Sequence, residues 1–476
     1  MEKFKDINPA ILLVLVFLPV YLLSGFGVTI SNDSLTNIEQ ITAMNLLDRS
    51  SHFGFHFLAI LSFAFFKLIG ISNAVISTQF MLSLISVAGI VALYRIVMIW
   101  KSNSNLALII AIIYGINSNI WRFSVQNEYH VLIPALSLIG IAFWLHGKQF
   151  IGAMVLGLAI LTSPFAIFSL PLIFIKEVKL NPGVILKSMA GFILVVGAVS
   201  LFTYKETIEG NWSYSLVYNY YAKTLSLTNP LRVLSIWVYG YLRAFHVFLP
   251  LLVVFLFTCR TSEKRLWYIL IATFIIHLPA AIPENRYGAY QMTLYPILAM
   301  ACGLVIYRVY QYNRLYFALL LGFFVGLNSF IVLQERGYHR SLSEMYSQMQ
   351  DDSAIEDDAL VFMYKATKPF NVLYANRLQG VSVYSGYQED LTDNLANYEL
   401  PDYKALIYSG KPVYLIESGV SLPDDYVKEL FSKFTAKQGA KAKGIGIKKI
   451  KEICPSATFQ QIEGYSITLY KVSCDS

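Results

Sequence analysis

The chain has 476 residues, of which 56% are hydrophobic and only 14% are charged. Its mean hydropathy is +0.54. These values exclude an ordinary soluble globular protein and indicate a polytopic membrane protein. The net charge of +7 does not predict a nucleic-acid partner, because the basic excess lies in the apolar part of the chain, where it is typical of membrane topology.

Charged residues are distributed unevenly along the chain. Residues 1–335 contain 33 of the 67 Lys, Arg, Asp and Glu residues, whereas the last 141 residues contain 34. This change predicts a transmembrane domain over residues 1–335 and a water-soluble domain over residues 336–476. The second segment is long enough to bury a core of its own.

The first uncharged run covers residues 10–30. It is longer than the apolar part of a secretory signal and has no clear cleavage site after it, so it predicts a retained membrane span. Further runs with little or no charge follow at about 53–72, 74–94, 105–121, 131–145, 149–175, 183–203, 233–258, 266–283, 288–307 and 315–334.

The basic residues between these runs predict the topology, because cytoplasmic loops collect Lys and Arg. Placing those loops on one side requires residues 53–72 to lie at the outer interface as an amphipathic helix, with Lys67 snorkelling. The run at 149–175 is expected to break at Pro164 and Pro171. The expectation is about eleven membrane helices, a cytoplasmic N-terminus and an extracytoplasmic C-terminal α/β domain.

This topology brings three ionisable segments to the outer face: the loop with Asp33, residues 121–130 with Glu128, and residues 283–291 with Arg286. A charge at the end of an apolar helix is costly unless it is paired or solvated, so a function is expected for each. The alternative for Asp33 and Glu128 is a solvated loop end.

Transfer from a lipid-anchored phosphate suits these residue types. Asp33 can act as general base on an acceptor hydroxyl, and Arg286 can neutralise a departing phosphate. Glu128 can orient the acceptor or hold a metal. The sequence contains no dense cluster of His and Asp residues with the spacing of metal ligands. No cofactor is therefore assigned, and a divalent metal stays an open alternative.

The order of these features resembles the GT-C superfamily of integral-membrane glycosyltransferases, and most closely its protein O-mannosyltransferase-like branch. The resemblance covers roughly residues 10–310. It rests on five stretches in order: "NDS", "SHFGFH", "NEYHVL", "GLAILTSP" and "ENRYGAYQMTLYPILA".

The resemblance implies roles for single positions. Asp33 matches the catalytic acid of the first outer loop, Glu128 a second acid, and Arg286 a group that binds the lipid phosphate. The family's amphipathic helix usually opens with His-Pro-Pro-Gly, whereas here Phe53 and Gly54 follow His52. This departure suggests a divergent member with a different substrate.

Further residues complete the expected site. Arg243 is an intramembrane arginine that needs a partner and is expected to face the same cavity as Arg286. His52, Tyr129, Tyr287 and Trp212 are candidates for a substrate groove. The alternative for the many tyrosines is an interfacial belt. His56, His130, His246 and His277 are expected to serve packing or interhelical hydrogen bonds.

The tail alternates strand-like runs such as "ALVFMY", "GVSVYS", "PVYLIES" and "YSITLYKVS" with the helical pattern "DDYVKELFSKFTA". An α/β sandwich is therefore expected. Cys454 and Cys474 can pair if this domain lies in an oxidising compartment.

The leading hypothesis is a membrane glycosyltransferase at the extracytoplasmic face of a bacterial plasma membrane. It would move a sugar, mannose or another hexose, from a polyprenyl-phosphate donor to a hydroxyl of an acceptor protein, lipid or glycan, with membrane lipid around it. One alternative is a transporter or flippase of a lipid-linked glycan, which usually shows pseudo-repeated halves that this sequence lacks. A third is a non-enzymatic scaffold that presents the tail.

Overall fold

The computed structural model describes residues 8–25, 37–38, 40–44, 46, 52–177, 181–202, 241, 244–277, 290–351, 356, 359–363, 382–385, 407–417, 445–463 and 468–474. The chain divides into two compact units, with the change between them at Leu333 and Gln334. The domain boundary expected at residue 335 stays a prediction.

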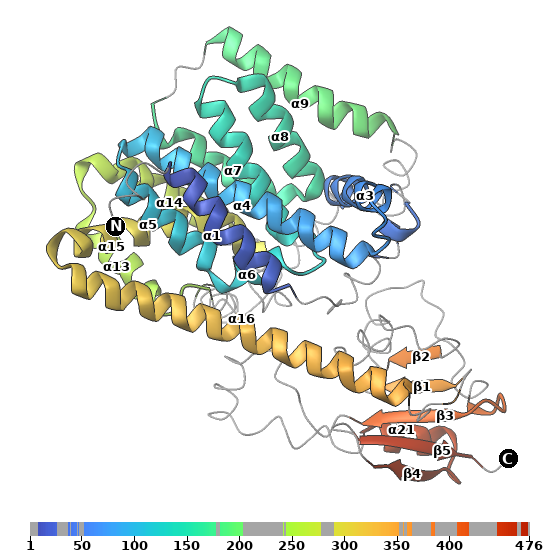
Figure 1. The fold of residues 1–476 in the computed structure, drawn as a ribbon. Helices are drawn as coiled ribbons and strands as arrows, with labels where there is room; N and C mark the ends of the chain where they lie inside the picture. Colours follow the sequence, from blue (N-terminus) through green and yellow to red (C-terminus); the bar gives the residue numbers. More distant parts are fainter. Residues whose placement is uncertain are drawn as a thin grey trace. The chain divides into compact units, whose positions relative to one another are not determined.

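The first unit is helical (Figure 1). Its α-helices are α1 (Pro9–Leu23), α3 (Phe53–Leu68), α4 (Ala74–Lys101), α5 (Ser104–Ile116), α6 (Ser118–Ser124), α7 (Leu132–Leu145), α8 (Gln149–Thr162), α9 (Pro182–Phe202), α13 (Leu249–Thr258), α14 (Lys264–His277) and α15 (Tyr295–Tyr312); α16 (Arg314–Asp351) continues past the unit's end. Short 3₁₀ segments are η3 (Tyr129–Val131), η4 (Pro164–Ile175), η5 (His246–Phe248), η6 (Thr261–Glu263) and η8 (Tyr290–Leu294).

Several of these helices can cross a bilayer. Among the described residues, four helical stretches are long and apolar enough: Ala74–Lys101, Pro182–Ser200, Gln291–Tyr312 and Arg314–Gly337. A fifth span results if α5 and α6, which meet at a bend of 63°, are one interrupted crossing. The protein is therefore a multi-pass integral membrane protein. The total of eleven helices, the interfacial position of α3 and the orientation stay predictions.

The break expected in the run at 149–175 is confirmed at Pro164. Helix α8 ends at Thr162, Ser163 has an extended backbone, and η4 begins at Pro164. A proline is favourable at the first position of a helical segment, because its missing N–H would have no partner there. Pro171 lies within η4 and does not end it.

Helix α7 packs against both α4 and α8. Small residues allow these close contacts. A Cβ on Gly89 of α4 would lie 2.9 Å from the Cβ of Ala135 on α7, closer than side chains normally approach. Such contacts between small residues are typical of helix pairs in membranes, where backbones approach closely.

The second unit contains a five-stranded mixed sheet of order β2-β1-β3-β5-β4 (Figure 1). Its strands are β1 (Leu360–Met363), β2 (Ser382–Ser385), β3 (Val413–Glu417), β4 (Thr458–Ile462) and β5 (Thr468–Ser473). Strand β1 pairs in parallel with β2 and β3, whereas β5 pairs antiparallel with β3 and β4.

One helix, α21 (Ile445–Ile453), packs against this sheet. Ile450 of the helix and Leu360, Leu415 and Val472 of the strands form a buried core. A disulfide joins Cys454, directly after α21, to Cys474, directly after β5. The tail contains a sheet, as expected, with α21 packed on it, while the sandwich stays a prediction and the predicted helix "DDYVKELFSKFTA" lies outside the described residues.

Candidate functional site

The site begins at the bend between α5 and α6. Asn117 is the N-cap residue of α6, and its side-chain oxygen accepts hydrogen bonds from the backbone N–H groups of Asn119 and Ile120. Its amide nitrogen donates to the backbone oxygen of Ala244 at 2.7 Å. Asparagine is a favoured cap because its oxygen satisfies N–H groups that lack a helical partner. A buried polar residue thus turns the chain inside an apolar bundle.

Further hydrogen bonds hold the segment after the bend in place. The side-chain nitrogen of Asn119 donates to the hydroxyl of Tyr295 on α15 at 2.8 Å. The indole of Trp121 donates to the hydroxyl of Ser24, directly after α1, at 2.6 Å. All of these groups are buried, so each bond also removes an unfavourable unpaired polar atom. The segment is therefore tied to two helices distant in sequence.

Glu128 lies in the non-helical stretch between α6 and η3 and is 9% exposed. Its Oε2 lies 3.6 Å from Nε2 of His130, which is equally buried. This distance is longer than a hydrogen bond but short enough for electrostatic contact. Catalytic contacts in a ligand-free protein are often long and shorten when substrate binds.

His52, the N-cap residue of α3, contacts Tyr129, which follows Glu128 in the chain. The rings of His52 and Tyr129 are stacked with centroids 3.6 Å apart and an angle of 21° between their planes. Nδ1 of His52 lies 3.0 Å from the backbone oxygen of Thr162. Because a carbonyl oxygen only accepts, Nδ1 carries the proton of this bond.

Gly54, two residues after His52, allows the start of α3 to come close to α8. A Cβ on Gly54 would lie 2.4 Å from the Oγ1 of Thr162 and 2.6 Å from the backbone oxygen of Leu158. No side chain fits in that space. The "SHFGFH" stretch therefore positions His52 because a glycine lets two helices touch.

Arg122 is a site residue that sequence reasoning did not select. It is 8% exposed, and its guanidinium lies 5.3 Å from the ring centroid of Phe123 and within electrostatic range of His130. The sequence did contain a signal for it, because Arg122, like Arg243, is an arginine in an apolar stretch. We call Arg122, Glu128, Tyr129, His130 and His52 the Glu128 cluster.

Two amide side chains lie beside the cluster. Gln126 and Asn127 are 1% and 0% exposed. Within the described part of the chain, neither the side-chain oxygen nor the nitrogen of either residue has a hydrogen-bond partner. Buried polar atoms normally have partners, so such groups indicate a place for water or a polar ligand.

The comparisons with known proteins establish the fold. No family model matches the sequence, and no curated protein sequence matches it either. Solved structures do. ArnT from Cupriavidus metallidurans bound to undecaprenyl phosphate matches with a TM-score of 0.54 and 11% identity, over 97% of both chains. Its apo state matches with 0.55 and 10%, over 97% of both.

A second similar protein is the Archaeoglobus fulgidus oligosaccharyltransferase in its apo form. It matches with a TM-score of 0.51 and 11% identity, over 88% of this chain and 70% of that one. The chain has a GT-C membrane fold. At such low identity the likeness is one of fold, and the O-mannosyltransferase-like branch stays a prediction.

The GT-C fold brings three of the expected site residues together: His52, Glu128 and Tyr129. The others lie outside the described residues: Asp33, Trp212, Arg243, Arg286 and Tyr287. Their roles stay predictions. In the described part of the chain, no three His, Cys, Asp or Glu side chains gather where they could hold a metal ion.

Proposed function

We propose that this protein is a glycosyltransferase that takes a sugar from a polyprenyl-phosphate donor. The observation that carries the proposal is the Glu128 cluster: a buried acid, two histidines and an arginine gathered in a bundle with a GT-C fold. A membrane protein retains such groups where it does chemistry or moves ions. ArnT, which shares the fold, was crystallised with undecaprenyl phosphate, the leaving group expected of such a donor.

The proposed reaction needs a base and a cation. A carboxylate removes the proton of an acceptor hydroxyl, and the acceptor oxygen attacks the anomeric carbon of the sugar. The bond between that carbon and the phosphate oxygen breaks, and polyprenyl phosphate leaves with the electron pair. We assign the base to Asp33 and the cationic groups at the leaving phosphate to Arg286 and Arg243.

The described residues would bind and orient. Glu128 would accept a hydrogen bond from the acceptor, with His130 3.6 Å from its carboxylate. The stacked pair of His52 and Tyr129 would form a rigid aromatic wall of a substrate groove. Tyr287 and Trp212 would complete that wall. Mannose or another hexose fits this reaction, with a protein, lipid or glycan as acceptor.

The proposed reaction takes place at the extracytoplasmic face of a bacterial plasma membrane, with the N-terminus in the cytoplasm. The disulfide between Cys454 and Cys474 supports this orientation, because such bonds persist in oxidising compartments and are rare in the cytosol. It would place the second unit outside.

The test is consumption of polyprenyl-phosphate sugars by membranes that contain the wild type, Asp33→Asn or Arg286→Ala at equal insertion levels. Glu177→Gln is a matched control, because that side chain is 81% exposed. We expect the wild type and the control to consume one of the polyprenyl-phosphate sugars tested. Donor consumption by both site variants should fall by at least about 100-fold.

Full activity of Asp33→Asn would exclude Asp33 as the base. A wild type that consumes no donor but moves labelled lipid between leaflets would exclude the enzyme and establish the transporter.

A further inference from the structure

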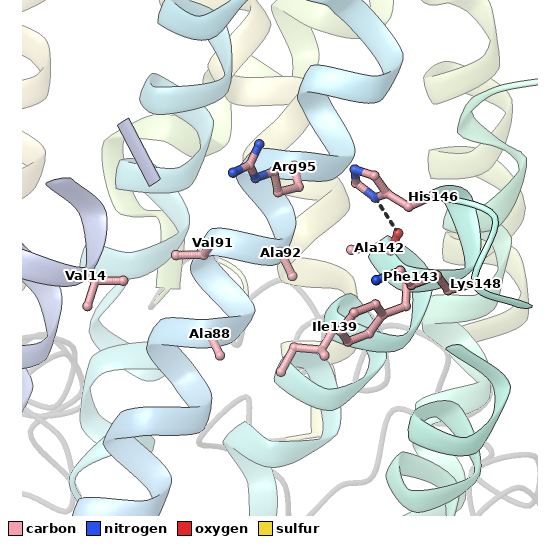
Figure 2. A pocket seen from close by; sticks show the side chains of 10 residues that line it. All are labelled: Val14, Ala88, Val91, Ala92, Arg95, Ile139, Ala142, Phe143, His146 and Lys148. Carbon is pink, nitrogen blue, oxygen red and sulfur yellow. Dashed lines mark hydrogen bonds between the residues drawn. The ribbon is translucent and has the colours of Figure 1, made fainter. Parts of the chain in front are cut away.

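A cavity of about 490 Å³ lies between α1, α4 and α7 (Figure 2). Its lining residues on α7 lie in the C-terminal half of that helix, whereas Glu128 precedes the helix's N-terminus. Its walls are mostly apolar and include Val14 of α1, Ala88 and Ala92 of α4, and Ile139 of α7. The volume is within the range of cavities that bind small ligands. Ile139, the lining residue of α7 nearest to the start of that helix, lies seven residues after Leu132, about 10 Å along the axis, so the cavity is separate from the Glu128 cluster.

Three basic side chains line the same cavity: Arg95, His146 and Lys148. Arg95 and Lys148 are exposed. Within the described residues, neither has an ion pair with a carboxylate. Their described contacts are with rings: the ammonium of Lys148 lies 5.8 Å from the ring centroid of Phe143, and the guanidinium of Arg95 lies 6.0 Å from that of Tyr94.

The basic groups belong to the helix ends. Lys148 lies in the turn between α7 and α8, and that turn depends on Gly147, whose φ is +84°. Arg95 lies six residues before the end of α4, about 9 Å along the helix. The cavity therefore combines an apolar interior with a basic rim, which suits an amphiphile with a negative head.

We propose that this cavity binds an anionic phospholipid. Its phosphate lies between Arg95 and Lys148, and an acyl chain lies against Val14, Ala92 and Ile139. Basic pockets between membrane helices on the cytoplasmic side are a known way to bind acidic headgroups, and the sequence predicts the cytoplasm at this end. The lipid would join α1, α4 and α7 whatever reaction takes place at Glu128, so the site does not depend on the proposed function.

The test uses the purified full-length protein in a mild detergent with added lipid. Native mass spectrometry counts bound molecules of phosphatidylglycerol and of phosphatidylcholine with matched chains, and thermal unfolding measures the protection that each gives. We expect the wild type to prefer phosphatidylglycerol, and Arg95→Ala/Lys148→Ala to lose at least tenfold in affinity for it. Lys187→Ala removes an exposed cation from α9 and should bind like the wild type.

A second variant tests binding of the acyl chain separately from binding of the headgroup. Ala88→Phe fills the cavity from an exposed position on α4 and leaves both cations in place. We expect it to unfold at the wild-type temperature without lipid and to gain less protection from phosphatidylglycerol. Its failure to fold would be visible in the lipid-free scan, and Val14→Phe then fills the same space from α1.

Three outcomes overturn the proposal. One is equal binding of phosphatidylglycerol by the wild type and the double variant. Another is full protection by soluble glycerol phosphate, which would assign the basic rim to a free anion. The third is displacement of phosphatidylglycerol by undecaprenyl phosphate at equal concentration, which would assign the cavity to the tail of a polyprenyl ligand.

Discussion

Acidic and basic side chains meet in both units of the molecule, but in different surroundings. In the first unit the side chains of Glu128 and Glu263 are 12% and 5% exposed, and their partners are His130 and Arg308. In the second unit Glu356 pairs with Lys471, and its side chain is 48% exposed. Both regions use the same chemical groups, while the amount of water around them differs.

The difference decides what each pair can do. A buried charge loses its hydration, so removing its partner leaves a large penalty, and keeping it needs a reason. An exposed pair is screened by water and contributes little. The buried carboxylates are therefore the ones expected to matter for activity or folding, and substitutions that leave an uncharged amide or methyl group test this directly.

The largest effect is expected for Glu128→Gln. The amide keeps the size of the side chain but removes its charge, so the pair with His130 is lost and the acceptor is no longer oriented. Donor consumption should fall by at least about 100-fold. The measurement is the same membrane assay as for Asp33, with Glu177→Gln as the exposed control. Wild-type turnover by a well-inserted Glu128→Gln protein would show that this buried acid has only a structural role.

The next effect concerns folding rather than chemistry. Glu263 in η6 forms an ion pair with Arg308 of α15 and also accepts the backbone N–H of Arg260 at 3.0 Å. Glu263→Ala should lower the free energy of unfolding by about 3 kcal/mol, because Arg308 loses its carboxylate partner in a mostly buried place and keeps only Thr258 among the described residues. Glu177→Ala removes a pair with Arg265 that is open to solvent and should cost less than about 1 kcal/mol. Thermal unfolding in detergent compares the two, and equal shifts would contradict the role given to burial.

Sequence patterns predict much of this fold because burial in lipid leaves a simple signal. Uncharged runs correctly indicate the long helices, and Pro164 marks a real break. In the second unit, the strand-like runs find β1, β2, β3 and β5. Strand β4, "TFQQI", is missed because most of its residues are polar and only partly covered.

The site is less predictable, because it depends on local capping and on distant contacts. The run at 105–121 gives no sign that Asn117 bends the helix, since hydropathy does not show where a buried side chain replaces backbone hydrogen bonds. Glu128 and Tyr129 can be selected from the sequence as polar groups at a helix end. The stack of His52 on Tyr129 joins residues 77 positions apart, and only the close approach at Gly54 makes it possible.

A smaller effect is expected when the charges are left alone and only the packing changes. In Gly54→Ala the new methyl group would meet Thr162 and Leu158 at distances that real side chains do not adopt, so α3 must move from α8. We expect a loss of about 1–3 kcal/mol in stability. Gly326→Ala is the matched control in α16, where a Cβ would meet nothing within 4 Å, and it should be neutral or slightly stabilising. Unchanged melting of both variants would contradict the close contact at His52.

The smallest effect is expected for the exposed pair of the second unit. The hydrogen bond from Lys471 lowers the pKa of Glu356 below its ordinary value of 4.5. A depressed pKa means that the pair stabilises the fold above about pH 4.5 and that this contribution is lost as the pH falls through the folded pKa. The same bond raises the pKa of Lys471 above 10.5, so the contribution is retained up to that pH and lost as the pH rises further.

Glu356→Gln should therefore be slightly less stable than the wild type at pH 6, and the difference should shrink as the pH falls below 4.5. Hydrogen exchange of the β3 and β5 amides measures the difference, with both proteins compared at the same pH so that intrinsic exchange cancels. Glu463→Gln, an exposed acid after β4 with no ion pair among the described residues, is the control. Because Glu356 and Lys471 are open to solvent, added salt should remove most of the difference at pH 6. A difference that persisted in 1 M salt would mean that the pair acts through packing, and the contrast with the buried carboxylates of the first unit would then rest on Glu128 and Glu263 alone.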